Sequence, residues 1–293
     1  MALNVPVFFT RLGSSVVFVA IMLTGLLWNE WSFLALVTLI NLLCIREFAR
    51  LMRNIYQDTR FPLWLTAAFA LLSTALLLYA SSLWAISNAG QGKPGLFYVY
   101  IVMYAHVTFV IFLLPFTPLL LLLAGMMAKP QYHRSVYRGL AGLAYITMPM
   151  FFLFCLYKAS NYVPLVLLCL IWSNDTMAYL FGSFFGKTPL SSISPKKTWE
   201  GTIGGAVITV VAAVAAGYFI PLFHVADWAA LALCATIAGT FGDLLESKLK
   251  RMAGVKDSGM MMPGHGGALD RFDSLLVATP FAFAYVVYFM HGL

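Results

Sequence analysis

The residues best suited to chemistry gather in one stretch, 242–274, of an otherwise apolar chain. Carboxylates suit a hard divalent cation, and lysine and arginine side chains suit phosphate groups. Clustered glycines let backbone N–H groups approach an anion closely. The stretch therefore predicts a metal-assisted phosphate site between two membrane helices. Its ionisable residues are Asp243, Glu246, Lys248, Lys250, Arg251, Lys256, Asp257, His265, Asp270, Arg271 and Asp273.

Two pairs of carboxylates in this stretch have helical spacing. Asp243 and Glu246 are three residues apart and would share a helix face, and Asp270 and Asp273 repeat that spacing at the start of the next helix. Brought together, the four could act as metal ligands and hold one or two hard cations beside a triphosphate. Glu246 and Asp273 could instead form interfacial ion pairs with basic neighbours.

The basic residues of the stretch are candidates for phosphate contacts. Lys250, Arg251, Lys256 and Arg271 could bind a triphosphate or a lipid phosphate. The alternative is ordinary positive charge on the cytoplasmic side, or attraction to anionic lipids. His265 stands between two glycines and beside carboxylates, which favours a phosphate contact or a positioning role.

The composition identifies the kind of protein that must position these groups. The chain has 293 residues, of which 61% are hydrophobic and 10% charged, against about 25% charged in a typical soluble domain. Long uncharged apolar runs predict an all-α, polytopic integral membrane protein without room for a separate soluble domain. The net charge of +7 fits basic cytoplasmic loops, so no nucleic-acid partner is expected. The four cysteines lie in apolar runs and are expected to be packing residues.

About nine membrane spans are expected. Residues 1–160 would form the scaffold and lipid-facing part, and residues 161–293 the part with the site, within one membrane domain. Residues 46–60 would be either a helix end in the headgroup layer or a solvated basic connector. Gly201 and Gly205 predict close helix packing, either between helices of one chain or between the two chains of a homodimer. The expected spans are about 12–28, 31–45, 61–86, 96–128, 139–157, 162–182, 202–222, 227–245 and 274–291.

The basic residues also predict the orientation. With the N-terminus in the cytoplasm and the C-terminus outside, all of the 18 basic residues except Lys93 and Lys158 fall on the cytoplasmic side. The site would then lie on the cytoplasmic side of the cell's inner (plasma) membrane, where nucleoside triphosphates and Mg²⁺ are available.

A longer pattern in the same stretch resembles a known family. The run S-K-L-K-R-M-A-G-V-K-D-S-G-M-M-M-P-G-H-G-G-A-L-D-R-F-D, Ser247 to Asp273, is similar to the signature of the phosphatidate cytidylyltransferases (CDP-diacylglycerol synthases). That signature is Ser-x-x-Lys-Arg, Lys-Asp, His-Gly-Gly and Asp-Arg-x-Asp, all present here at the family spacing. Met262 and Ala268 depart from it by apolar changes that concern packing. The resemblance implies that Asp243 and Asp270 carry the metal.

Two further segments resemble motifs of the same family. They are S-P-K-K-T-W-E-G at 194–201 and N-D-T-x-A-Y-x-x-G at 174–182, so the resemblance covers about 170–275. Lys196 and Lys197 could instead be interfacial charge, and Glu200 a first-turn residue favourable to the helix dipole. With the glycines of the loop, the implied substrate-binding residues are Asp175, Ser194, Lys196, Lys197, Thr198, Glu200, Gly266 and Gly267.

The resemblance implies a reaction between CTP and phosphatidic acid that gives CDP-diacylglycerol and pyrophosphate. The resemblance implies Mg²⁺ as a cofactor and leaves room for a second cation, divalent or K⁺. It also implies contact with membrane lipids. Two alternatives stay open at this stage: a CTP-using polyisoprenol kinase, and an ion-coupled transporter with Asp175 and Asp243 as cation sites.

Overall fold

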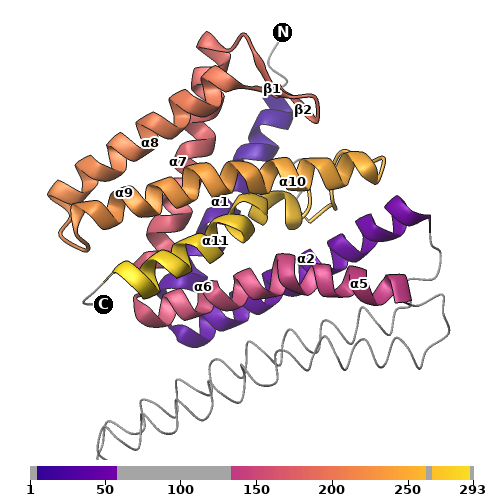
Figure 1. Ribbon diagram of the computed structural model, residues 1–293, viewed down its shortest axis with the longest axis horizontal. Helices are drawn as coiled ribbons and strands as arrows, with labels where there is room; N and C mark the ends of the chain where they lie inside the picture. Colours follow the sequence, from indigo (N-terminus) through magenta and orange to yellow (C-terminus); the bar gives the residue numbers. More distant parts are fainter. Residues whose placement is uncertain (1–4, 58–132, 262–265, 291–293) are drawn as a thin grey trace, which may run out of the picture.

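The computed structural model describes residues 5–57, 133–261 and 266–290 (Figure 1). The spans expected at 61–86 and 96–128 lie outside the described residues, as does His265. The described part is a bundle of helices with one small β-hairpin. The expected helical class is therefore confirmed, and the hairpin is a local departure from it.

The first two helices are α1 (Val5–Leu27) and α2 (Glu30–Tyr56). Asn29 starts α2 with a capping box, in which its side chain accepts from Ser32 N at 2.8 Å and Ser32 Oγ accepts from Asn29 N at 3.0 Å. Because α2 continues to Tyr56, the helical interpretation of residues 46–60 is confirmed as far as Tyr56. The helix thus continues beyond residue 45, the expected end of the membrane span.

The remaining elements form two long helices that are each interrupted by a π-helical segment, three further helices and the hairpin. The π-helical segments are η3 and η4, each between two α-helices. Strands β1 and β2 pair in antiparallel fashion, and Trp199 N donates to Thr188 O at 2.9 Å at the base of the hairpin. In chain order the elements are α5 (His133–Gly142), η3 (Leu143–Thr147), α6 (Met148–Ala159), α7 (Tyr162–Phe185), β1 (Pro189–Ser191), β2 (Ser194–Thr198), α8 (Trp199–Phe219), α9 (Val225–Leu233), η4 (Cys234–Ala238), α10 (Gly239–Met252) and α11 (Leu269–Phe289).

Six helices of the described part are long and apolar enough to cross a membrane. They confirm the multi-pass character of the chain. The count of nine and the orientation of the termini stay predictions. The six are Glu30–Tyr56, Arg138–Ala159, Tyr162–Phe185, Trp199–Phe219, Val225–Met252 and Leu269–Phe289.

Helix α10 corrects one boundary. The expected eighth span ended at 245, but α10 runs to Met252, so the first third of the charged stretch is helical rather than a loop. Gly239, Gly242 and Glu246 are its buried residues, three and four positions apart, and they form one stripe that faces the bundle. The charged residues on this helix are therefore held on a rigid element.

Glycines bring the helices that carry the site close together. A Cβ at Gly205 would lie 2.7 Å from Ala178 Cα, and one at Gly201 would lie 2.8 Å from Gly182 Cα. Helix α8 therefore lies directly on α7, which confirms the close packing expected from the glycine spacing, here within one chain. A Cβ at Gly242 would lie 3.1 Å from Ser274 Cα, so α10 approaches α11 in the same way.

The core joins the N-terminal helices to the C-terminal ones. The Phe18 ring on α1 lies 5.8 Å from that of Phe272 on α11 and 6.2 Å from that of Trp172 on α7. Phe33 on α2 stacks on Tyr157 of α6 at 4.3 Å between ring centroids. Buried apolar contacts of this kind fix α1 against α7 and α11, and α2 against α6.

Candidate functional site

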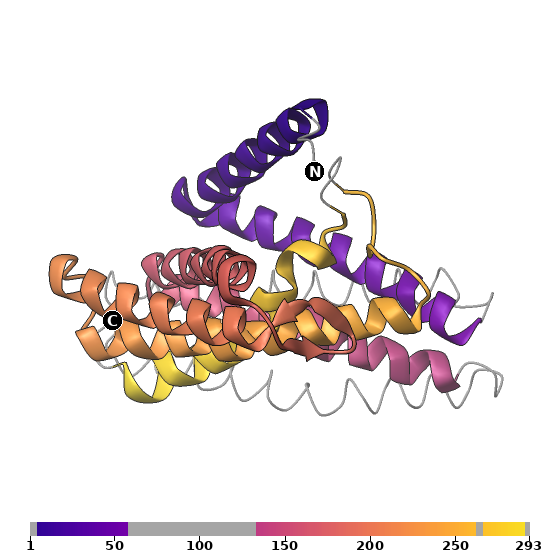
Figure 2. The ribbon, with the colours of Figure 1, turned by 90° about the horizontal axis from the view of Figure 1, so that it is seen from above.

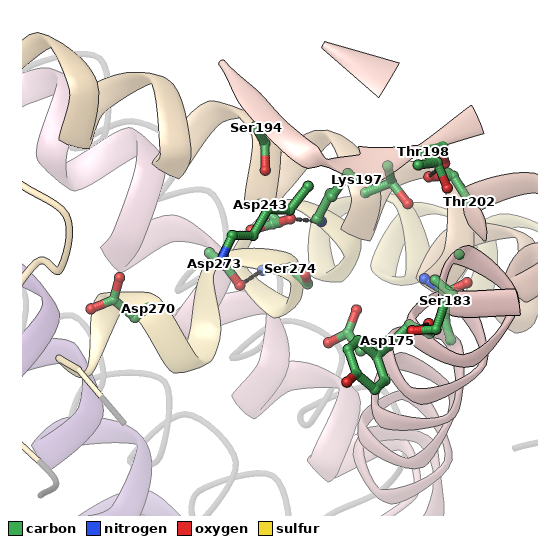
Figure 3. Close-up of a pocket in the computed structure, with 16 residues that line it drawn as sticks. Asp175, Ser183, Ser194, Lys197, Thr198, Thr202, Asp243, Asp270, Asp273 and Ser274 are labelled. Carbon is green, nitrogen blue, oxygen red and sulfur yellow. Dashed lines mark hydrogen bonds and ion pairs between the residues drawn. The ribbon is translucent and has the colours of Figure 1, made fainter. Parts of the chain in front are cut away.

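A cavity of about 470 Å³ lies between α7, the hairpin, α8, α10 and α11. Figure 3 shows Asp243 and Asp273 in the middle of the group, with Asp175 and Asp270 to either side. Segments from three separate parts of the sequence therefore meet at one place, as the motifs predict. The expected site residues that line the cavity are Asp175, Ser194, Lys196, Lys197, Thr198, Asp243, Asp270 and Asp273.

Lys197 is the cation at the centre of this cavity. Its ammonium forms an ion pair with the carboxylate of Asp243, which Figure 3 marks with a dashed line. Burial lowers the pKa of Lys197, and attraction to Asp175 and Asp273 opposes that shift. The hairpin thus delivers a positive charge among acidic residues that come from three helices.

Lys250 joins two carboxylates at the inner side of the site. Its Nζ lies 2.5 Å from Glu246 Oε2 and 2.6 Å from Asp270 Oδ1. Glu246 is fully buried and does not line the cavity. Of the two interpretations of Glu246, the structure shows the ion pair. Lys250 touches the site through Asp270 rather than by facing the cavity.

Backbone groups hold the carboxylate of Asp270 in place. Its Oδ2 accepts from Gly267 N at 2.7 Å and from Ser258 N at 2.9 Å, and Ser258 Oγ lies 2.9 Å away. Gly266 has a φ of +81°, the left-handed conformation that glycine adopts without strain. A Cβ there would also lie 2.7 Å from Asp270 Oδ2. Gly266 and Gly267 therefore shape the loop around Asp270, and neither lines the cavity.

The hairpin places Glu200 away from the cavity. Its carboxylate accepts from Lys187 N and Thr188 N, both at 3.1 Å, and so closes the base of the hairpin. Thr198 caps α8 by accepting from Gly201 N at 3.1 Å. The structure thus gives Glu200, expected to bind substrate, a role in shaping the hairpin. It also lies in the first turn of α8, which was the alternative interpretation.

Three of the expected phosphate-binding residues lie on the surface. Arg251, Lys256 and Arg271 are exposed, and none of them lines the cavity. Arg251 Nη1 donates to Val255 O at 3.5 Å, in the turn that follows α10. Among the described residues, the cations that line the cavity are Lys196 and Lys197.

Sequence reasoning missed Glu47, a partly buried residue of α2. Its carboxylate accepts from Ala268 N at 3.0 Å, Leu269 N at 2.9 Å and Ser258 Oγ at 2.7 Å. One signal could have revealed it. Glu47 is three residues from Cys44 and four from Leu51, so it falls on the apolar stripe of a helix rather than on the arginine face. An acid in that position indicates a buried polar partner.

The chemistry of the cavity fits a hard cation. The carboxylates of Asp175, Asp243, Asp270 and Asp273 all reach it, and oxygen ligands are those that Mg²⁺ prefers. Within residues 5–57, 133–261 and 266–290, no group of three such side chains has metal-ligand geometry. Ammonium groups of two lysines pair with two of these four carboxylates instead, Lys197 with Asp243 and Lys250 with Asp270. The Mg²⁺ site therefore stays a prediction.

Comparisons with known proteins agree with the motifs. A phosphatidate cytidylyltransferase of Staphylococcus aureus is 41% identical over 144 residues, which are 48% of this chain and 55% of that protein. One of Synechocystis sp. is 42% identical over 127 residues, 43% of each chain. The chloroplastic phosphatidate cytidylyltransferase 4 of Arabidopsis thaliana is 47% identical over 118 residues, 39% of this chain and 29% of that protein. These matches span about half or less of the relatives' length.

A family model extends the similarity over nearly all of the sequence. It describes the cytidylyltransferase family and matches residues 9–289. The match includes α2 and Glu47 as well as the motif-bearing helices. The chain belongs to the cytidylyltransferase family.

Proposed function

We propose that this protein transfers CMP from CTP to phosphatidic acid, giving CDP-diacylglycerol and pyrophosphate. The observation that carries the proposal is the cavity where Asp175, Lys197, Asp243 and Asp270 meet. These residues come from the three segments with the family motifs, and the relatives named phosphatidate cytidylyltransferase support the choice of substrates. The protein would therefore be a membrane-bound nucleotidyltransferase of phospholipid biosynthesis.

The reaction demands neutralisation of charge and alignment. A phosphate oxygen of the lipid attacks the α-phosphorus of CTP, and the bond to the oxygen that bridges the α- and β-phosphorus breaks as pyrophosphate departs. The lipid phosphate is already ionised near neutral pH, so no general base is needed. Lys196 and Lys197 line the cavity and would bind the phosphate groups of the two anionic reactants.

The acidic residues have a different task. Asp243 and Asp270, with Asp175 and Asp273 beside them, would hold Mg²⁺, and a second cation, divalent or K⁺, would fit the same donor set. When bound, the cation neutralises the triphosphate and the departing pyrophosphate. Lys197 would then exchange its contact with Asp243 for one with a substrate phosphate.

The lipid would reach the cavity from the side of α7. Tyr179 lines the cavity and is 74% exposed on the outer surface of that helix, and Phe184 nearby is 77% exposed. Apolar side chains on this surface suit acyl chains that remain in the bilayer. We place the site on the cytoplasmic side of the cell's inner membrane, since the basic segments and the supply of CTP belong there. A homodimer is compatible with this arrangement.

Transfer of label from CTP to phosphatidic acid in detergent micelles tests the proposal. We expect labelled CDP-diacylglycerol that requires Mg²⁺, disappears with EDTA and is lost in Asp270→Asn. Glu30→Gln is the matched control, because it makes the same change at the far end of α2, where Glu30 pairs with Lys158. Folded wild-type protein that forms no such product would refute the proposal, and a phosphorylated polyisoprenol would identify a kinase instead.

A further inference from the structure

One carboxylate of the N-terminal half reaches the start of the helix that carries Asp270. Glu47 Oε1 accepts from Ala268 N at 3.0 Å, and its Oε2 accepts from Leu269 N at 2.9 Å. These N–H groups belong to the cap and first residue of α11, and Ala268 has no side chain able to cap them. An anion placed there also interacts favourably with the helix dipole. Figure 2 shows the segment before α11 rising against α2.

The loop is shaped to admit this carboxylate. A Cβ on Gly259 or on Gly267 would lie 2.6 Å from Glu47 Cδ in each case. A side chain at either position would therefore collide with the carboxyl group. Both glycines lie in the 247–273 run: Gly259 follows α10, and Gly267 directly precedes Ala268, the cap of α11. Their lack of a side chain is explained by Glu47 and not by a substrate, since neither of them lines the cavity.

Ser258 connects Glu47 to Asp270. Its Oγ lies 2.7 Å from Glu47 Oε2 and 2.9 Å from Asp270 Oδ2, while its backbone N donates to the same oxygen of Asp270 at 2.9 Å. A rotation of the Glu47 side chain would move Ser258 and the first turn of α11 together. Asp270 belongs to this first turn, and its carboxylate accepts from Ser258 N.

We propose that Glu47 is a positioning residue of the reaction, which holds Asp270 in place through Ser258 and the start of α11. The inference rests on the proposed function. Glu47 itself does not line the cavity and so acts without touching substrate. Through this contact the N-terminal half, which supplies no motif residue, determines the geometry of the site.

Glu47→Gln tests the proposal because an amide keeps the size of the side chain. Three donors face the two oxygens of Glu47, and glutamine offers only one oxygen, so its NH₂ group must face at least one donor. We expect kcat to fall by about 10- to 100-fold, the usual effect of losing a group that orients a functional carboxylate. The KM for CTP should change by less than about threefold, because Lys196 and Lys197 are untouched. Glu30→Gln, on the same helix, should retain wild-type kcat.

Ser258→Ala provides a second test that leaves the cap of α11 intact. We expect a smaller fall in kcat, and Glu47→Gln combined with Ser258→Ala should be no more than about twofold worse than Glu47→Gln alone, because the two residues act in one chain of contacts. Additive losses, or a wild-type kcat in Glu47→Gln, would overturn the proposal.

Amide hydrogen exchange separates this proposal from the proposed function, since it needs no substrate. In Glu47→Gln, exchange should become faster at residues 258–261 and 266–270 and remain unchanged in α7 and α8. Faster exchange throughout the protein would show a merely structural role and would contradict the inference. If wild-type protein transferred no CMP, the proposed function would be refuted. The exchange pattern would still show whether Glu47 positions Asp270.

Discussion

A substitution of Lys250 tests whether its ammonium stabilises the protein by pairing with the carboxylates of Glu246 and Asp270. The Lys250 ammonium stands between Glu246 Oε2 at 2.5 Å and Asp270 Oδ1 at 2.6 Å, and the exposed fractions of the three side chains are 13%, 0% and 8%. Lys250→Met keeps the apolar stem and removes the charge. It would leave two carboxylates close together without the cation between them.

The magnitude follows from the burial of these groups. Removing one partner of a buried ion pair destabilises a protein by about 3–5 kcal/mol. For a chain of this size, each kcal/mol shifts the unfolding midpoint by about 2–4 °C, so we expect Tm to fall by about 6–20 °C. Tryptophan fluorescence during heating in detergent micelles would measure it.

A second substitution checks the cause. Glu246→Gln in the Lys250→Met background removes one of the two unpaired charges, and we expect it to restore at least half of the lost Tm. Lys248→Met is the matched control, because Lys248 is exposed on the same helix, and it should change Tm by less than about 2 °C. If Lys250→Met behaved like Lys248→Met, or if Glu246→Gln restored nothing, the charge balance described for this site would be wrong.

Three further predictions concern the cavity and its walls. Asp243→Asn should lower CMP transfer on the order of 100-fold and leave the detergent-solubilised protein monodisperse by size exclusion; a smaller loss would remove Asp243 from the centre of the reaction. Gly205→Ala should lower Tm and activity, since the added Cβ would lie 2.7 Å from Ala178 Cα and crowding of this kind costs about 1–3 kcal/mol. The control is Gly13→Ala, because a Cβ at Gly13 would meet nothing within 4 Å. Because burial lowers the pKa of Lys197, its ammonium should lose its proton at a lower pH than that of an ordinary lysine, so the KM for CTP should rise on the alkaline side. Lys197→Arg should move this rise to higher pH. A pH profile of KM that is the same in Lys197→Arg as in wild type would refute the binding of CTP phosphate by Lys197.

The sequence predicted the parts of the site whose signals are local. Apolar runs predicted the six long apolar helices of the described part, since a helix across a bilayer needs a long uninterrupted apolar segment. Gly201 and Gly205 predicted close packing of the helix they begin, because small residues on one helix face allow backbones to approach; the structure shows that the partner is α7. The motifs selected Asp175, Lys197 and Asp243, which the fold brings into one cavity.

The end of α10 was not predictable from the apolar run alone. Polar residues begin after Gly242, and the expected span therefore ended at 245, whereas the helix continues to Met252. One buried stripe through Glu246 keeps the helix in the bundle, although its other faces are charged. As a result Lys250 is held on a helix, between two carboxylates.

Only the tertiary structure decided which charges face the cavity and which support it. Glu200 and Lys197 are three residues apart, yet the hairpin turns Glu200 onto backbone N–H groups and Lys197 towards Asp243. Glu47 and Leu269 are 222 positions apart and carry no shared pattern. The sequence by itself determined the membrane helices and the reactive groups, because these depend on composition and short spacing. The packing of α2 against α11 determined which group holds Asp270, since that contact depends on the meeting of distant segments.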